Sequence, residues 1–271
     1  MKNLLLKRTI TSVGLLCVLF LFMYVDWLCA LMITAFIILG LREFFLMLRN
    51  KGIKAFWLFG LVLGATIPLS LVFRFELTRN WEFLFLVLAI LFLIVMQLRR
   101  GVNSGVIVDI STTIFGVVYI SWLLSFLIRI RYLPDGLGLL LAVIIITKMG
   151  DIGAYLVGTR FGKTPLLPRI SPNKSWEGSL GGLCFSVLGA FVSRNFICLG
   201  YLHLLLLGVG LGILGQLGDL SESLMKRDCQ VKDAGNILPG MGGILDFIDS
   251  LLFTGPAFYF YMMIILNKLQ L

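Results

Sequence analysis

The apolar segment LGLLLAVIIITKMGDIGAYLV, residues 137–157, indicates the fold class most clearly. Residues 137–146 carry no charge, and an apolar helix of about 20 residues crosses the roughly 30 Å hydrocarbon layer of a membrane. Lys148 and Asp151 interrupt the run near its end. At helical spacing these two side chains share one face with Tyr155, which predicts an ion pair within the helix. Charges inside a membrane are costly, so both a self-neutralising pair and a functional site remain open.

The rest of the chain repeats this pattern. Of its 271 residues, 59% are apolar and 14% are charged, whereas a soluble domain carries about 25% charged residues. We therefore predict an all-α, polytopic integral membrane protein with about nine transmembrane helices. The predicted spans are Thr9–Tyr24, Trp27–Leu41, Ala55–Phe73, Phe83–Leu98, Val106–Ile128, Leu137–Val157, Ser179–Ser193, Tyr201–Leu217 and Gly243–Leu266.

The distribution of Lys and Arg predicts the topology. With the N-terminus in the cytoplasm, 16 of the 23 basic residues fall in cytoplasmic segments, as the positive-inside rule requires. The basic start Met1–Arg8 resembles a secretory signal, but no small-residue cleavage site follows before Asp26, so we expect a retained span. Both long polar loops of the C-terminal half then face the cytoplasm.

The two halves differ in composition. Residues 1–135 are predicted to form N-terminal hydrophobic transmembrane helices, in which Asp109 is the main buried charge and is expected to be paired or protonated. Residues 136–271 are predicted to form a C-terminal transmembrane catalytic region, where glycines are frequent and charges enter the span ends. Glycines at 208, 210, 212, 215 and 218 are typical of close helix packing. Five scattered cysteines and the single His203 indicate neither a zinc site nor a disulfide framework.

The first polar loop is basic and contains glycines. Its segment GTRFGKT, residues 158–164, is one residue short of a phosphate-binding P-loop and follows a membrane helix rather than a strand, so we reject that interpretation. The glycine backbone with Arg160 and Lys163 still favours a nearby anion. Further along, Ser175 followed by Glu177 is typical of a helix start, which structure alone could explain.

The second polar segment is QLGDLSESLMKRD, residues 216–228. If it is helical, Asp219, Glu222, Ser223 and Lys226 share one face, so carboxylates lie beside a cation. A solvated lattice of salt bridges is the ordinary explanation of such a face. Against it, this is the densest polar run in a hydrophobic chain.

The third segment is LPGMGGILDFIDS, residues 238–250. Proline and glycines prevent a helix before about Gly243, and Asp246 and Asp249 then project from one face of the first turns. Free backbone N–H groups at this helix start suit a phosphate, and the two aspartates with Asp219 predict a Mg²⁺ site of hard oxygen ligands. Aspartates are also common at helix starts for dipole reasons alone.

Together these segments resemble the phosphatidate cytidylyltransferases, also called CDP-diacylglycerol synthases. The run SLMKRDCQVKDAGNILPGMGGILDFID, residues 223–249, carries the resemblance, and GDIGAY (150–155), RFGK (160–163) and SPNKSWEG (171–178) precede it in the same order. The similarity covers roughly Lys148 to Asp249, and the N-terminal half is similar only in being hydrophobic. Two positions depart from the family pattern, Met241 in place of the usual His and Phe247 in place of the usual Arg.

The resemblance implies transfer of CMP from CTP to phosphatidate, giving CDP-diacylglycerol and pyrophosphate at the cytoplasmic face of a bacterial inner membrane. Its implied partners are these two substrates and membrane lipid, with no nucleic acid. It implies catalytic roles for Asp219, Asp246, Lys226 and Lys232, and Mg²⁺ held by Asp219, Asp246 and Asp249. Substrate-binding roles are implied for Arg160, Lys163, Ser171, Lys174, Ser175, Glu177, Ser223, Arg227, Asp233, Gly242 and Gly243.

The two departures affect the expected site, and several alternative functions stay open. A phosphate monoester is already anionic at neutral pH, so Met241 removes no required base, whereas Phe247 could weaken substrate binding.

Another CTP-dependent lipid cytidylyltransferase or kinase would share most of these features. A secondary transporter would show paired helix interruptions in both halves, and only the C-terminal half has them. An inactive relative and a homodimer also stay open.

Overall fold

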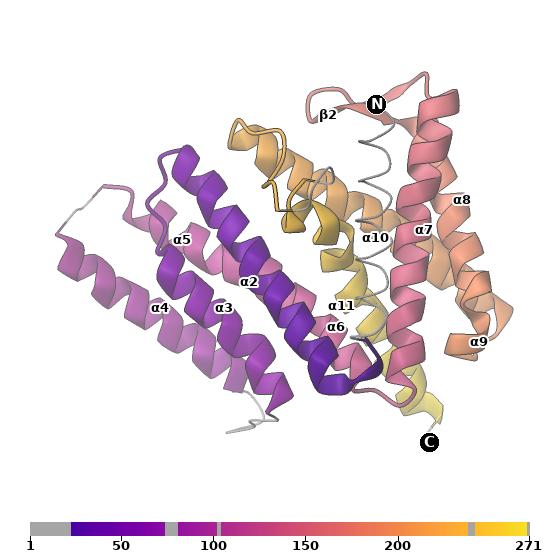
Figure 1. The fold of residues 1–271 in the computed structure, drawn as a ribbon, viewed down its shortest axis with the longest axis horizontal. Helices are drawn as coiled ribbons and strands as arrows, with labels where there is room; N and C mark the ends of the chain where they lie inside the picture. Colours follow the sequence, from indigo (N-terminus) through magenta and orange to yellow (C-terminus); the bar gives the residue numbers. More distant parts are fainter. Residues whose placement is uncertain (1–22, 74–80, 102–103, 238–241, 270–271) are drawn as a thin grey trace. The chain divides into compact units, whose positions relative to one another are not determined.

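The structure of the protein is a computed structural model, and it describes residues 23–73, 81–101, 104–237 and 242–269 (Figure 1). Within these ranges five helices are long and apolar enough to cross a membrane, namely Asp26–Asn50, Val106–Arg131, Gly136–Phe161, Tyr201–Asp228 and Ile244–Leu266. An α-helical, multi-pass membrane protein is therefore confirmed. The count of about nine spans stays a prediction, because most of the first predicted span lies outside the described residues.

The chain forms two compact units, Met1–Ile128 with Cys229–Leu245, and Arg129–Asp228 with Asp246–Leu271. The first unit holds α2 (Asp26–Asn50), α3 (Trp57–Val72), α4 (Trp81–Arg100), α5 (Val106–Gly116) and the π-helical turn η1 (Val117–Trp122). Helix α6 (Leu123–Arg131) continues from η1 into the second unit. The second unit also holds α7 (Gly136–Phe161), β1 (Pro165–Leu167), β2 (Ser171–Ser175), α8 (Trp176–Val192), α9 (Arg194–Ile197), α10 (Tyr201–Asp228) and all but the start of α11 (Ile244–Leu269).

In the first unit, glycines let α3 approach α2 closely. A Cβ atom at Gly60 or Gly64 would overlap Phe45 or Leu41 of α2. The buried Asp109 is paired, as expected, because its Oδ1 accepts the backbone N–H of Lys54 at 3.2 Å and its Oδ2 lies 3.5 Å from Nη1 of Arg100. These contacts bring the end of α4 and the α2–α3 connection to the same end of this unit.

In the second unit, small residues bring α7, α8, α10 and α11 together. A Cβ atom at Gly208 would lie 2.6 Å from Val187 Cα of α8, and one at Gly218 would lie 2.5 Å from the Asp249 carbonyl oxygen of α11. The predicted role of the glycine series in helix packing is confirmed at these positions. At Gly210, by contrast, an added Cβ atom would meet nothing within 4 Å.

The loop between α7 and α8 contains a small hairpin that the sequence pattern did not indicate. Strands β1 and β2 pair antiparallel, with Pro165 opposite Ser175. The hairpin is closed by α8, since Trp176 N donates to Thr164 O at 2.9 Å. Ser175 is the N-cap of α8 and its Oγ accepts from Gly178 N at 3.1 Å, which confirms the predicted helix start.

Candidate active site

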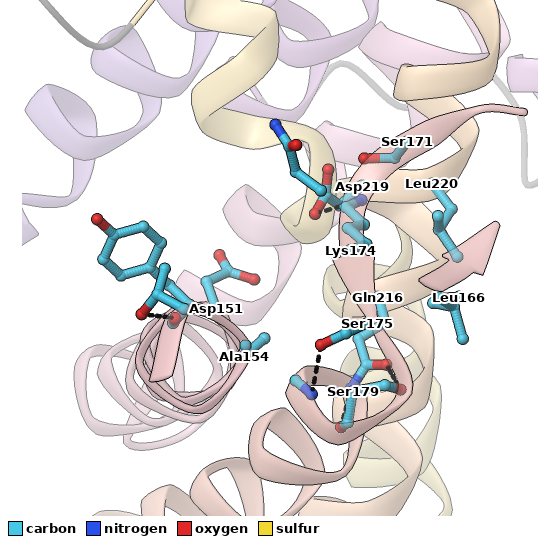
Figure 2. Close-up of a pocket in the computed structure, with 15 residues that line it drawn as sticks. Asp151, Ala154, Leu166, Ser171, Lys174, Ser175, Ser179, Gln216, Asp219 and Leu220 are labelled. Atoms are coloured by element: carbon cyan, nitrogen blue, oxygen red, sulfur yellow. Dashed lines mark hydrogen bonds and ion pairs between the residues drawn. The ribbon is translucent and has the colours of Figure 1, made fainter. Parts of the chain in front are cut away.

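A cavity of about 580 Å³ opens in the second unit between α7, the hairpin, α8 and α10 (Figure 2). Asp151 from α7 and Asp219 from α10 lie on its wall, and so do three of the predicted substrate-binding residues, Ser171, Lys174 and Ser175. Carboxylates and a cation therefore face a space large enough for a small ligand.

An ion pair ties the hairpin to α10 at this cavity. Lys174 Nζ lies 2.7 Å from Asp219 Oδ2, and both side chains are partly exposed. Nearby, Gln216 Nε2 donates to Ser179 O at 2.9 Å, and Ser179 Oγ donates to the Gln216 side-chain oxygen. Gln216 lines the cavity but was not predicted as a site residue, because a single amide one turn before Asp219 gives no distinctive sequence signal.

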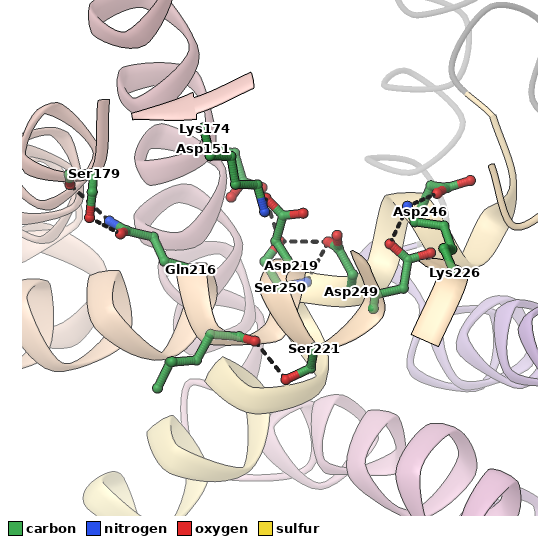
Figure 3. A network of polar contacts seen from close by, with 12 residues as sticks. Asp151, Lys174, Ser179, Gln216, Asp219, Ser221, Lys226, Asp246, Asp249 and Ser250 are labelled. Atoms are coloured by element: carbon green, nitrogen blue, oxygen red, sulfur yellow. Dashed lines mark hydrogen bonds and ion pairs between the residues drawn. The ribbon is translucent and has the colours of Figure 1, made fainter. Parts of the chain in front are cut away.

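The predicted pair of Lys148 and Asp151 is present, with Nζ and Oδ2 2.9 Å apart. Lys148 Nζ also donates to the Phe247 carbonyl oxygen at 3.0 Å and to Ser250 Oγ at 3.3 Å. Ser250 Oγ in turn lies 3.0 Å from Asp151 Oδ2 and 3.2 Å from Asp249 Oδ1, and its single proton can be donated to either carboxylate. The pair is therefore part of a polar network that joins α7 to α11, of which Figure 3 shows Asp151, Ser250 and Asp249.

Three carboxylates form the carboxylate cluster, which we define as Asp219, Glu222 and Asp249. One ligand oxygen of each lies within 4.8 Å of the others, and Figure 3 shows Asp219 and Asp249 directed toward one another. Glu222 is fully buried, and its Oε1 has no hydrogen-bond partner within the described part of the chain. Hard oxygen donors and an unsatisfied buried oxygen suit a divalent cation such as Mg²⁺.

Lys226 lies between two acidic side chains of different helices. Its Nζ is 2.7 Å from Glu222 Oε2 and 2.5 Å from Asp246 Oδ1. Asp246, which we predicted as a metal ligand, is thus held by Lys226, and Glu222 completes the carboxylate cluster in its place. The spacing of Glu222 from Asp219 could have indicated this, but the same spacing also fits a solvated face.

The start of α11 belongs to the first unit and is occupied by a carboxylate. Glu43 of α2, only 2% exposed, accepts the backbone N–H of Ile244 at 3.1 Å and of Leu245 at 2.8 Å. These two N–H groups are therefore not free for a phosphate, contrary to our expectation. A Cβ atom at Gly243 would lie 2.5 Å from Glu43 Oε2, so this predicted substrate-binding residue packs against Glu43.

Glu177 holds the hairpin rather than lining the cavity. Its side chain accepts from the hydroxyl of Thr164, and also from the backbone N–H of Thr164 at 3.2 Å and of Lys163 at 3.1 Å. The hydrogen bond from the Thr164 hydroxyl is the main reason that the pKa of Glu177 is lowered to about 2. Glu177 thus remains a carboxylate at neutral pH.

The other predicted site residues lie in both units. In the second unit Arg160 and Lys163 are exposed, Ser223 is half-buried, and Arg227 Nε donates to Ile170 O at 3.1 Å. In the first unit Lys232 and Asp233 are exposed, and Gly242 has a φ of +94°. Met241 lies outside the described residues. His203 Nδ1 lies 2.7 Å from the Tyr261 hydroxyl, which joins α10 to α11.

Comparison with known proteins identifies the family. The model of the cytidylyltransferase family matches residues 6–265. A phosphatidate cytidylyltransferase of Synechocystis sp. is 35% identical over 274 residues, covering 90% of this chain and 91% of the relative. The phosphatidate cytidylyltransferase of Bacillus subtilis is 36% identical, covering 83% and 86%, and that of Haemophilus influenzae is 43% identical over 137 residues, covering 48% of each chain. The chain therefore belongs to the cytidylyltransferase family.

Proposed function

We propose that this protein is a phosphatidate cytidylyltransferase, which transfers CMP from CTP to phosphatidate and releases pyrophosphate. The observation that carries the proposal is the ion pair of Lys174 with Asp219 on the wall of a cavity, beside the carboxylate cluster, in a unit built of membrane-spanning helices. One substrate of this reaction is a membrane lipid and the other is soluble. The phosphatidate cytidylyltransferases among the relatives support the same reaction.

The reaction requires the protein to position its two substrates and to neutralise their negative charge. An oxygen of the phosphatidate phosphate attacks the α-phosphorus of CTP, one P–O bond forms, and the bond to the pyrophosphate oxygen breaks. A phosphate monoester has its second pKa near 6, so it is already a nucleophilic anion at neutral pH and needs no general base. The protein's main task is therefore to hold two anions together.

Cations of the second unit suit this task. Lys174 and Lys226 are each held by carboxylates, Lys174 by Asp219 and Lys226 by Glu222 and Asp246. A lysine fixed in this way is a preorganised positive charge for a phosphate oxygen. Arg160 and Lys163, which are exposed near the hairpin, attract the anionic nucleotide from solution.

We propose Mg²⁺ as the cofactor, with the carboxylate cluster as its ligands. Three carboxylate oxygens within 4.8 Å of one another match the preference of this ion for a few carboxylates together with waters or phosphate oxygens. The bound ion supplies neutralisation of the charge on the pyrophosphate leaving group. In this proposal Asp246 acts by holding Lys226, and its predicted role as a ligand is tested alongside.

The site is proposed to face the cytoplasm of a bacterial cell from its inner membrane. Lys174 pairs with Asp219, and Arg227 donates to Ile170, so both polar segments of the second unit lie at the same end of that unit. The positive-inside distribution assigns both segments to the cytoplasm.

The test is an assay of purified protein in detergent with phosphatidate and labelled CTP. We expect label in the lipid and release of pyrophosphate with Mg²⁺, and loss of both with EDTA. Asp219→Asn and Asp249→Asn are expected to lower the rate by about 10²–10³-fold, whereas Asp135→Asn, an exposed position in a left-handed turn that Asn tolerates, keeps it. Folded protein that makes no CDP-lipid would overturn the proposed reaction, and activity unaffected by EDTA would overturn only the metal.

Two additions separate the finer alternatives. A panel with polyprenol as acceptor distinguishes a lipid kinase, because a kinase releases CDP rather than pyrophosphate.

Comparing Glu222→Gln with Asp246→Asn over a Mg²⁺ titration shows which carboxylate belongs to the metal site. We expect the larger rise in the Mg²⁺ concentration for half-maximal rate with Glu222→Gln. Light scattering on the same sample decides between a monomer and a homodimer.

A further inference from the structure

The first unit contains a second cavity, of about 560 Å³, at the end where α2 and α4 meet the α2–α3 connection. None of its lining residues belongs to the proposed active site. Its lining combines four cations with exposed apolar side chains, namely Arg42, Arg49, Lys54, Arg100, Leu46 and Trp57.

The α2 side of this cavity is an amphipathic stripe. Arg42, Leu46 and Arg49 are four and three residues apart, so they lie on one face of the helix over two turns. Both arginines are exposed, and within the part of the chain that the structure describes no carboxylate pairs with either of them or with the Lys54 ammonium group. Among the described residues, three positive charges at the rim of the cavity therefore have no carboxylate partner.

The fourth cation is fixed in place. Arg100 Nη1 donates to the Lys54 carbonyl oxygen at 3.0 Å, and the Arg100 guanidinium carbon lies 3.6 Å above the centre of the Phe56 ring. Asp109 offsets part of its charge at 3.5 Å. A guanidinium held on an aromatic face loses little conformational freedom when it binds an anion, which favours affinity.

The apolar side of the cavity points to the class of ligand. Leu46 is 44% exposed and Trp57 is 57% exposed, and both line the same cavity as the four cations. A soluble phosphate would gain nothing from these two side chains. A ligand with a phosphate group and an acyl chain would bury them and pair with the arginines, and basic pockets at the ends of membrane helices bind anionic headgroups in this way.

We propose that this cavity is a binding site for the phosphate headgroup of an anionic phospholipid, separate from the site of reaction. Arg42, Arg49, Lys54 and Arg100 contact the phosphate, while Leu46 and Trp57 contact the first part of the acyl chains. The bound lipid is retained rather than converted, because the described lining of the cavity carries no carboxylate that could hold a catalytic metal.

The test is native mass spectrometry of the full-length protein in detergent, titrated with dioleoyl phosphatidylglycerol or dioleoyl phosphatidylcholine. Phosphatidylglycerol is expected to bind saturably and at least tenfold more tightly. The variant Arg42→Gln/Arg49→Gln should weaken phosphatidylglycerol binding about tenfold. The matched control Lys51→Gln/Arg99→Gln removes the same charge from the same region but from residues outside the cavity lining, and should change binding less than about twofold.

Equal losses in the two double variants would mean diffuse attraction and would overturn the site, as would equal binding of the two lipids. A third titration uses glycerol 3-phosphate, which has the phosphate but no acyl chain. Binding as tight as that of the lipid, lost in Arg42→Gln/Arg49→Gln, would overturn the lipid assignment in favour of a soluble phosphate. If the double variant does not purify, the single variants Arg42→Gln and Arg49→Gln are each expected to weaken lipid binding about threefold, and no effect in either refutes the proposal.

Discussion

Replacing Lys226 by Met is expected to destabilise the second unit and abolish the transfer reaction. Lys226 Nζ lies 2.7 Å from Oε2 of the fully buried Glu222 and 2.5 Å from Oδ1 of Asp246. At 2.7 Å and an effective dielectric constant of about 20, the gross attraction of such a pair is about 6 kcal/mol. Much of this is offset by desolvation, but removing one partner leaves a buried charge alone, which costs about 3–5 kcal/mol.

The assay is thermal unfolding of the purified protein in detergent, together with the transfer rate. At about 2–4 °C per kcal/mol, Lys226→Met should lower the midpoint by roughly 6–20 °C. The double variant Lys226→Met/Glu222→Gln removes the unpaired buried charge, so it should recover at least half of the lost stability and remain inactive. A Lys226→Met variant that melts within about 2 °C of the unmodified protein, or a double variant no more stable than the single one, would refute the reasoning.

Other variants test the packing, the helix start and the hairpin. Gly218→Ala places a methyl group against the Asp249 carbonyl oxygen, which should move α10 away from α11 and lower the transfer rate about tenfold or more. The control variant Gly210→Ala places its methyl group in open space. It should keep the transfer rate and the melting temperature of the unmodified protein. Glu43→Gln keeps the shape of the side chain but loses its charge and one hydrogen-bond acceptor at the start of α11. We therefore expect thermal unfolding to show a loss of about 1–2 kcal/mol of stability. An unchanged unfolding midpoint would contradict the role of Glu43 as the cap of α11. The pKa of Glu177 is lowered from 4.5 to about 2, so its stabilisation of the hairpin is complete above about pH 4.5 and is lost as the pH falls toward 2. Hydrogen exchange of the hairpin amides should follow this pH dependence in the unmodified protein and lose it in Glu177→Gln; the same pH profile in both would argue against it.

Features that depend on spacing along one helix could be predicted from the sequence. The pair of Lys148 and Asp151, the N-cap at Ser175 and the membrane class all follow from residues within two turns of each other or from uninterrupted apolar runs. Each of these is decided by local geometry. The structure agrees with them because the distant contacts of these groups, such as those of Lys148 with Phe247 and Ser250, add to the local contacts and do not replace them.

Features that depend on which helices are neighbours could not be predicted. Glu43 follows Arg42 at the end of an apolar run, so it was placed beyond the predicted span Trp27–Leu41, yet it is buried and caps α11. The choice of Glu222 over Asp246 for the carboxylate cluster depends on the distance between α10 and α11, which Gly218 sets. The spacing of residues along one helix gives no information about the distance between α10 and α11.

The contact of Lys148 with Phe247 bears on the departure from the family pattern at that position. Lys148 Nζ donates to the Phe247 carbonyl oxygen at 3.0 Å and lies 5.1 Å from the centre of its ring. The carbonyl contact is available to any residue, so it does not depend on the side chain at 247. The ring adds a cation–π attraction that keeps a positive charge beside the position where the family usually has Arg. Phe247 therefore removes one guanidinium from the start of α11 without leaving that part of the helix uncharged, because α7 supplies an ammonium group there.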